Sequence, residues 1–229
     1  QEEGGDFSRK FSPEDDDLGS REAIADVDRL MWYPAEVNTS IRPGWFYHAS
    51  EDDKVRSLEE LLHIYYGSVG GNACFLLNVP PDRRGLIHEN DVARLEELGS
   101  VIKKTFSCNL AARATAKASD TQSDRFVVEN IFDENKDTFW CPSVGNEHPV
   151  IEVDLDQPQL FDKIVLAEHI RSGQRIESFS LAYRQGEDWV EFYNGTVVGY
   201  KRICSFEPLE AQYIRLKITA SRWYPTLAF

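Results

Sequence analysis

The sequence is short of positive charge, because 25 lysines and arginines stand against 39 aspartates and glutamates and leave a formal net charge of −14 at pH 7. A surface this acidic repels phosphate backbones and anionic lipid headgroups, so nucleic acid and membrane surfaces are unfavourable partners. The chain also lacks any run of about eighteen apolar residues, so we expect no membrane span. Neutral partners, such as sugars or other proteins, remain open.

Cysteine is scarce, and several common catalytic patterns are missing. The four cysteines lie far apart without metal-ligand spacing, which favours free, mostly buried thiols over a disulfide framework. The five histidines show no paired metal spacing either, so we interpret them as structural or surface residues. There is no glycine-rich phosphate loop and no nucleophile elbow. No signal peptide is visible, and the acidic, polar residues 1–30 predict an exposed loop.

The first hundred residues alternate between helical and strand patterns. Apolar residues at helical spacing predict helices over 54–67 and 89–106, with Gly67 placed to end the first helix. Between them, ACFLLNV (73–79) is a continuous apolar run of strand length, which predicts a strand buried on both faces. Asn78 ends that strand, where it either lines a site or satisfies loop backbone groups. This pattern indicates the end of an α/β domain whose beginning is missing.

From about residue 110 the pattern changes to short β-branched and aromatic runs at hairpin spacing, from FVVENIF (126–132) to YIRLKIT (213–219). Turn-forming stretches separate the runs, which predicts an antiparallel all-β domain, most simply a sandwich. We place the boundary near FSCNLAARA, which gives one domain over 1–108 and a second over 109–229.

One turn of the β region, FDENKDTFW, gathers hard oxygen groups on Asp133, Asn135, Asp137 and Thr138. Oxygen ligands in one tight loop are what Ca²⁺ requires. The same residues also suit a solvated acidic turn between two strands, and the sequence does not decide between these interpretations.

The stretch WYPAEVNTSIRPGWFYH (32–48) concentrates aromatic side chains around one acid, Glu36, and one arginine, Arg42. Prolines and a glycine prevent a helix there. Desolvation by the aromatics would raise the pKa of Glu36 and make it a candidate proton donor, although an ion pair with Arg42 or a loop cap explains it at least as well. The indole faces of Trp32 and Trp45 suit either a sugar pocket or an ordinary core.

Longer stretches carry a family resemblance. GWFYHASEDDKV and IYYGSVGGNACFLLNVPPDRRGLI resemble the late part of the catalytic barrel of family-29 glycoside hydrolases, the α-L-fucosidases, and the match covers about residues 30–105. The 32–48 stretch resembles the subgroup that prefers α-1,3- and α-1,4-linked fucose. GQRIESFSLAYR and VGYKRI resemble the sandwich that follows that barrel and, more loosely, the discoidin or coagulation-factor C-type fold of carbohydrate-binding modules. DENKDTFW is similar to a turn, DGNxxTxW, that often holds calcium, but Glu134 replaces its glycine.

The resemblance implies an α/β plus all-β fold, with the C-terminal end of a (β/α)8-type barrel followed by an antiparallel, discoidin-like β-sandwich. It implies a retaining hydrolase of fucosylated glycans, in which one carboxyl group attacks the sugar and another trades a proton, with no cofactor for catalysis and a possible structural calcium. The family's nucleophilic Asp and its Gly-Asn-Glu acid/base motif do not occur before residue 30, and the Gly-Asn-Glu at 145–147 lies in the β region. We therefore expect a fragment of a periplasmic or extracellular enzyme, with the catalytic pair outside this chain.

The resemblance also assigns individual residues. Trp45 matches the position that packs against the methyl group of fucose, and Glu36 is assigned to substrate positioning, with proton transfer as a minor role. Trp32 and Arg42 are weaker candidates for the same rim. Two other classes remain open, namely a non-catalytic carbohydrate-binding protein and a structural sandwich whose aromatics are core. The enzyme hypothesis expects Trp45 and Glu36 to form one wall of a pocket at the carboxyl edge of the sheet.

Overall fold

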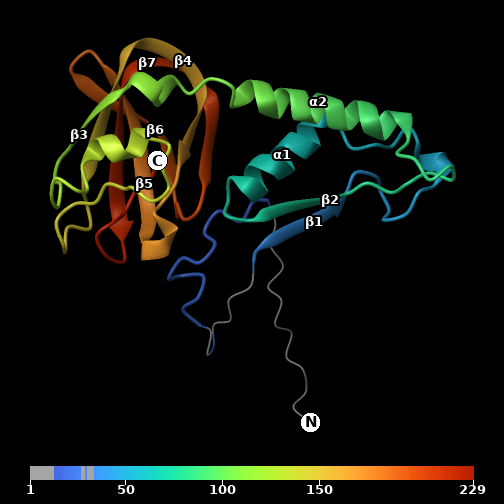
Figure 1. Ribbon diagram of the computed structural model, residues 1–229, viewed down its shortest axis with the longest axis horizontal. Helices are drawn as coiled ribbons and strands as arrows, with labels where there is room; N and C mark the ends of the chain where they lie inside the picture. The colour runs from blue at the N-terminus through green and yellow to red at the C-terminus, as the bar shows by residue number, and fades with distance from the viewer. Residues whose placement is uncertain (1–12, 27–28, 30–33) are drawn as a thin grey trace.

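The computed structural model describes residues 13–26, 29 and 34–229, which form a short α/β layer and a β-sandwich (Figure 1). The elements of the α/β layer are β1 (Glu36–Ser40), η1 (Ala49–Glu51), α1 (Leu58–Val69), β2 (Cys74–Asn78) and α2 (Glu89–Thr105). Those of the β region are η2 (Leu110–Arg113), β3 (Thr115–Ala118), η3 (Val128–Phe132), β4 (Val150–Leu166), η4 (Ile170–Ser172), β5 (Ile176–Gln185), β6 (Asp188–Gly195) and β7 (Arg202–Ser221).

The two strands of the α/β layer run parallel, with Glu36 opposite Cys74 and Ser40 opposite Asn78. Alternate side chains of β2 pack with α1 and α2 in one apolar cluster, so the helices cover one face of the strand pair. Leu76 is 48% exposed on the other face. The predicted burial of β2 on both faces is therefore wrong for the described residues, because nothing among them covers that second face.

Local signals explain where the first helix begins and ends. Helix α1 begins after Ser57, whose hydroxyl accepts a hydrogen bond from the Glu60 N–H, while the Glu60 carboxylate accepts one from the Ser57 N–H. Gly67 does not end the helix as predicted, since α1 continues to Val69. A Cβ atom at residue 67 would overlap Pro13, so this glycine instead permits the close approach of an earlier segment.

The five-stranded antiparallel sheet has the order β3-β4-β7-β5-β6 and confirms the predicted sandwich. β4 and β7 are 17 and 20 residues long. Register shifts interrupt their pairing between Asp154 and Gln159, so the pair bends. On one side of the bend, β4 and β7 pair with each other and also with β3 and β5, respectively; on the other side they pair only with each other. The predicted strand FVVENIF is instead the 3₁₀ turn η3, which contributes Val128 to the core.

The sandwich packs against the amino edge of the α/β layer, at the turn between α1 and β2. Asn72 in that turn donates from Nδ2 to the Val198 carbonyl at 3.0 Å and accepts at Oδ1 from the Lys201 N–H at 3.0 Å. The Ile203 N–H donates to the Gly70 carbonyl at 3.1 Å. Because this turn precedes β2, the sandwich lies at the opposite end of the strands from their carboxyl edge, as Figure 1 also shows.

Residues 13–26 run between the two parts and bind to the sandwich. Arg202 donates to the Asp16 carbonyl at 2.8 Å, Gln174 donates to the Leu18 carbonyl at 2.8 Å, and Arg222 donates to the carbonyl of residue 19 at 2.7 Å. Leu18 is 9% exposed, so this part of the predicted exposed loop is packed. The rest of residues 1–30 lies largely outside the described residues.

All four cysteines are free, but only two are buried. Burial raises the pKa of the Cys141 thiol to about 11 and that of Cys204 to about 12, so both behave as inert apolar groups. Cys74 and Cys108 are exposed, which differs from the expectation of mostly buried thiols. Within the described part of the chain, no helix combines the length and apolarity needed to cross a bilayer.

A buried ion pair joins the loop after β1 to the first turn of α2. The Arg42 side chain is fully buried, and its Nε donates to both carboxylate oxygens of Asp91, at 3.1 and 2.9 Å. Its Nη1 donates to Asp52 Oδ1 at 2.9 Å. Burial lowers the pKa of the guanidinium, but the hydrogen bonds to both carboxylates outweigh burial, so the pKa rises above its ordinary value.

A second buried charged group, Glu168, links three loop segments of the sandwich. It is 3% exposed, and its carboxylate accepts hydrogen bonds from the N–H groups of Arg175 at 2.7 Å, Ile176 at 3.0 Å and Gly199 at 2.7 Å. Burial raises the pKa of Glu168 to about 7, although the three N–H donors oppose this shift.

Removing the acid of the buried ion pair should destabilise the chain strongly. Asp91→Ala leaves the Arg42 charge without its main partner, and we expect the free energy of unfolding to fall by about 3–5 kcal/mol, measured by equilibrium urea unfolding. The control is Glu97→Ala, which breaks an exposed pair with Arg94 on the same helix and should cost at most ~1 kcal/mol. Similar small losses for both variants would contradict a buried, coupled pair.

The raised pKa of Glu168 predicts a pH-dependent stability. Between the unfolded pKa of about 4.5 and the folded pKa of about 7, the folded chain holds the proton more tightly, so the free energy of unfolding should fall as pH rises through this window, by up to ~3 kcal/mol. Thermal unfolding from pH 4.5 to 8 measures the slope. Glu168→Gln removes the titrating group, and an unchanged slope in this variant would exclude Glu168 as its source.

Candidate functional site

The carboxyl edge of the two parallel strands is the natural place for a site in this layer. β1 and β2 end side by side at Ser40 and Asn78, and the loops 41–57 and 79–88 leave from that edge toward the two helices. In folds built from parallel strands and covering helices, ligands bind beyond the carboxyl ends of the strands. The loop that carries two of the four predicted substrate-binding residues, Arg42 and Trp45, begins here.

Trp45 follows the carboxyl end of β1 and is held through its backbone. The Asn78 Nδ2 donates to the Trp45 carbonyl at 3.0 Å and to Ser40 Oγ at 3.0 Å. Ser40 Oγ in turn donates to the Gly44 carbonyl at 2.8 Å. The Trp45 side chain remains 52% exposed, so its indole is available to a ligand while its main chain is bound. Asn78 therefore satisfies backbone groups, one of the two alternatives that the sequence left open.

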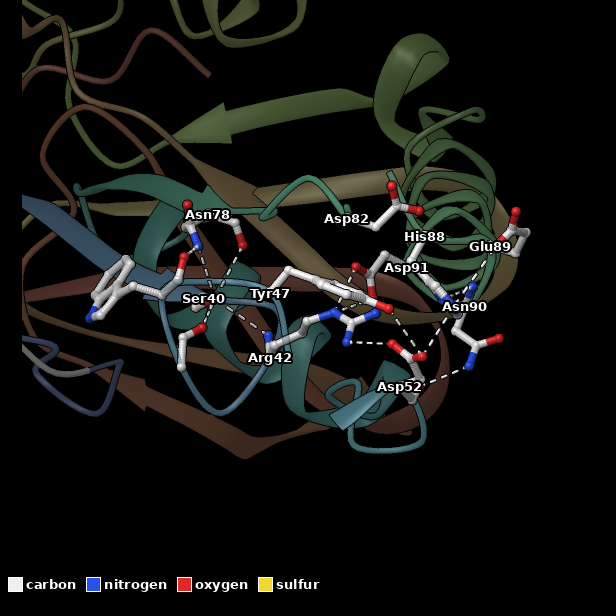
Figure 2. Close-up of polar contacts among 12 residues, drawn as sticks. Ser40, Arg42, Tyr47, Asp52, Asn78, Asp82, His88, Glu89, Asn90 and Asp91 are labelled. Atoms are coloured by element: carbon white, nitrogen blue, oxygen red, sulfur yellow. Dashed lines mark hydrogen bonds and ion pairs between the residues drawn. The ribbon is translucent and has the colours of Figure 1, made fainter. Parts of the chain in front are cut away.

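A second network surrounds Arg42 on the same edge, and Figure 2 shows it converging on Asp52. The Tyr47 hydroxyl donates to Asp52 Oδ2 at 3.2 Å, and the Asn90 amide donates to the Asp52 carbonyl at 2.8 Å. His88 Nε2 lies 3.4 Å from the same carboxylate oxygen. The Arg42 guanidinium also lies over the Tyr47 ring, 4.9 Å from its centroid. Burial and the nearby Asp52 charge raise the pKa of the Tyr47 hydroxyl.

The remaining acids of the 79–91 segment are engaged as well. Asp82 accepts hydrogen bonds from the Arg84 side chain at 2.8 and 2.6 Å, and these lower its pKa. Glu89 lies 2.8 Å from the same guanidinium, and backbone and Arg84 hydrogen bonds lower its pKa too. Asp52 and Asp91 neutralise Arg42. Each of these four carboxylates is therefore held in an ion pair with an arginine.

Glu36 and Trp45 do not lie together as the one-wall hypothesis expected. Glu36 is exposed at the amino end of β1, opposite Cys74, whereas Trp45 follows the carboxyl end. The four residue steps from Glu36 to Ser40 separate the two ends by ~13 Å at ~3.3 Å per residue. Within the described residues the two side chains therefore belong to different ends of the sheet.

Two further candidates have different outcomes. Trp32 lies outside the described residues. Arg42 is not at a rim, because its side chain has no exposed surface and is directed at Asp91 and Asp52. The hypothesised pair between Glu36 and Arg42 is replaced by these contacts. Sequence reasoning missed Asp91 as a partner, and its only local signal is an acid in the first turn of a helix.

The acidic turn of the sandwich folds onto itself. Asp133 accepts hydrogen bonds from the Asn135 N–H at 2.8 Å and from the Thr138 hydroxyl at 2.5 Å, and Asn135 Oδ1 accepts from the Asp137 N–H at 3.0 Å. Glu134, which stands where related turns have glycine, has a φ of 57°. No cluster of three or more potential His, Cys, Asp or Glu ligands occurs among the described residues, and calcium stays a prediction.

Comparisons with known proteins place both parts of the chain. A family model described as "Alpha-L-fucosidase" matches residues 15–105, and one described as "F5/8 type C domain" matches residues 115–228. The chain is 37% identical over 231 residues to Alpha-L-fucosidase 1 of Arabidopsis thaliana, covering 98% of this chain and 43% of that protein. It is 39% identical over 202 residues to an alpha-L-fucosidase 1 homologue of Oryza sativa subsp. japonica, covering 86% and 39%.

Solved structures agree with these matches. The crystal structure of SpGH29 aligns with a TM-score of 0.80 at 37% identity, covering 85% of this chain and 42% of the other. A GH29 fucosidase of Ruminococcus gnavus in complex with fucose aligns with a TM-score of 0.80 at 32% identity, covering 88% and 41%. The chain thus spans about two fifths of the relatives it matches. Residues 15–105 therefore match the α-L-fucosidase family, and residues 115–228 match the F5/8 type C domain.

Proposed function

We propose that this chain is the distal part of an α-L-fucosidase, a retaining glycoside hydrolase that removes α-1,3- or α-1,4-linked fucose from glycans outside the cytoplasm. One observation carries the proposal. Within the segment that matches the α-L-fucosidase family, Trp45 presents a half-exposed indole at the carboxyl edge of two parallel strands. An apolar face in such a position suits a 6-deoxy sugar, which has a methyl group where other hexoses have a hydroxyl.

The reacting carboxyl groups, in this proposal, come from the part of the family that the chain does not cover. A retaining mechanism needs one carboxylate free to attack the sugar and one carboxylic acid able to donate a proton. At the described carboxyl edge, Asp52, Asp82, Glu89 and Asp91 are all bound to arginines. Glu36 is exposed but lies at the other end of β1. This chain would therefore supply binding and support rather than bond cleavage.

Trp45 would act in the binding step. Burying the fucose methyl against its indole contributes about 1 kcal/mol, on the scale of one methylene group. L-Galactose differs from L-fucose by a hydroxyl on that carbon, so it would lose this contact and leave a polar group against an apolar face. Trp45 would therefore favour the deoxysugar at the binding step, before the glycosidic bond is cleaved.

The first test concerns catalysis by the 229-residue chain alone. We expect no hydrolysis of an aryl α-L-fucoside above the uncatalysed rate, because one wall of a site lacks the charged groups that stabilise the transition state. A chromogenic assay with the complete enzyme as positive control measures this. Turnover by the purified chain that survives removal of contaminating fucosidase would show that the catalytic pair lies within it.

The second test concerns the methyl contact in the complete enzyme. Trp45→Ala should lower the ratio of kcat/KM for an aryl fucoside to that for the matching L-galactoside by about fivefold, which corresponds to about 1 kcal/mol. Trp223→Ala makes the same change at a half-exposed tryptophan of the sandwich and should leave the ratio unchanged. Equal losses for both sugars in Trp45→Ala would rule out a role at the methyl group.

A further inference from the structure

We propose that Ser40 and Asn78 are positioning residues that set the direction of the Trp45 indole and thereby the preference for a 6-deoxy sugar. The inference rests on the proposed function for its consequence, but the geometry stands on its own contacts. Neither side chain is aromatic or charged. Both act through the backbone of residues 44 and 45.

The two peptide groups that meet at the Trp45 Cα are both held. The Gly44 carbonyl belongs to the peptide before Trp45 and accepts the Ser40 hydroxyl at 2.8 Å. The Trp45 carbonyl belongs to the peptide after it and accepts the Asn78 amide at 3.0 Å. Fixing both peptide planes fixes φ and ψ of Trp45, and with them the direction of its Cα–Cβ bond. The indole then has only its two side-chain torsions left.

Ser40 and Asn78 also hydrogen-bond to each other, so their contacts with the backbone of residues 44 and 45 are coupled. The Asn78 amide has two N–H bonds, and it donates to Ser40 Oγ as well as to the Trp45 carbonyl, both at 3.0 Å. The Ser40 hydroxyl uses its single hydrogen for the Gly44 carbonyl and accepts from Asn78. The Asn78 carbonyl accepts the Ile41 N–H at 2.9 Å, which extends the parallel ladder by one residue.

These anchors lie on rigid elements rather than on the loop itself. Ser40 is 6% exposed and is the last residue of β1, and Asn78 is the last residue of β2, opposite it. Arg42, two residues beyond Ser40, is clamped to Asp91 and Asp52. A loop that would otherwise lose conformational freedom on binding is therefore ordered beforehand, which lowers the entropic cost of binding at the exposed indole.

Asn78→Asp tests the hydrogen bonds donated by the Asn78 amide with minimal change in side-chain shape. The carboxylate cannot donate, so it loses both hydrogen bonds and repels the Trp45 carbonyl. Asn130→Asp is the matched control, because the Asn130 amide also donates to two backbone carbonyls, those of Arg125 at 3.1 Å and Phe139 at 2.9 Å, but in the sandwich. Ser40→Ala removes the hydrogen bond to the Gly44 carbonyl. Ser40→Thr retains the hydroxyl and should behave as the unmodified protein.

The first readout needs no enzymatic activity. ¹⁵N relaxation of the 229-residue chain, with the Trp45 indole signal assigned from Trp45→Phe, reports the order of residues 44–46. We expect loss of order in Asn78→Asp and Ser40→Ala, with order retained in Asn130→Asp and Ser40→Thr. Unchanged order in both Asn78→Asp and Ser40→Ala would overturn the proposal, whatever reaction the protein catalyses.

The second readout is the specificity of the complete enzyme. Asn78→Asp and Ser40→Ala should lower kcat/KM for an aryl fucoside by about ten- to hundredfold and lower the fucoside to L-galactoside ratio, because a small misplacement of a binding group carries a large cost. Asn130→Asp should lower the melting temperature but leave the ratio unchanged. Equal losses on both sugars would overturn the specificity role. Absence of fucosidase activity in the unmodified enzyme would instead overturn the proposed function and leave the relaxation result standing.

Discussion

A fully buried guanidinium has to be neutralised where it lies, and the carboxyl edge of this chain is arranged around that requirement. Arg42 leaves β1 two residues after its last strand position and meets Asp91 in the first turn of α2 and Asp52 beyond η1. Leaving the charge without its partners would cost several kcal/mol. Asp91 is doubly suited to its place, since a carboxylate near a helix N-terminus is favoured by the helix dipole. The two loops of the edge are therefore held at a fixed distance before any ligand arrives.

The two ends of the parallel strands carry different tasks. At the carboxyl edge lie the half-exposed Trp45 and the polar networks that hold its loop. At the amino edge lies the turn with Asn72, which hydrogen-bonds to the sandwich. In folds with parallel strands, residues at the carboxyl edge commonly bind ligands, and residues at the amino edge commonly contribute to stability. Within the described residues the sandwich accordingly supports the α/β layer at the amino ends of β1 and β2. It lies at the opposite end of these strands from Trp45.

Much of the fold follows from local sequence patterns, and the exceptions have physical reasons. The helices and β2 were predicted because apolar periodicity and caps act over a few residues. The long strands β4 and β7 were predicted as shorter pieces, since a bend with a register shift looks like a turn in sequence. Gly67 was predicted as a helix end, although its true constraint is the packing of Pro13, 54 positions earlier.

The site was harder to predict, because its contacts join distant positions. Trp45 was identified through its resemblance to a family pattern, and its exposure agrees with a binding role. The pairing of Arg42 with Asp91 spans 49 positions and has no sequence signature, so a nearer acid, Glu36, was the natural but incorrect partner. Their short spacing in the sequence placed Glu36 and Trp45 in one segment, but it could not reveal that the length of β1 separates them.

The contact between Asn72 and Gly199 limits which sandwich domains could replace the one in this chain. Both residues have left-handed backbones, with φ values of 70° and 63°, and a side-chain carbon at position 199 would overlap the Asn72 amide. The two family matches meet between residues 105 and 115, which suggests a simple splice point. A foreign sandwich joined there would nevertheless meet the α1–β2 turn with a different loop, without this interlocking fit. Recombination at the boundary therefore has to carry the 198–203 loop along, or redesign both surfaces together.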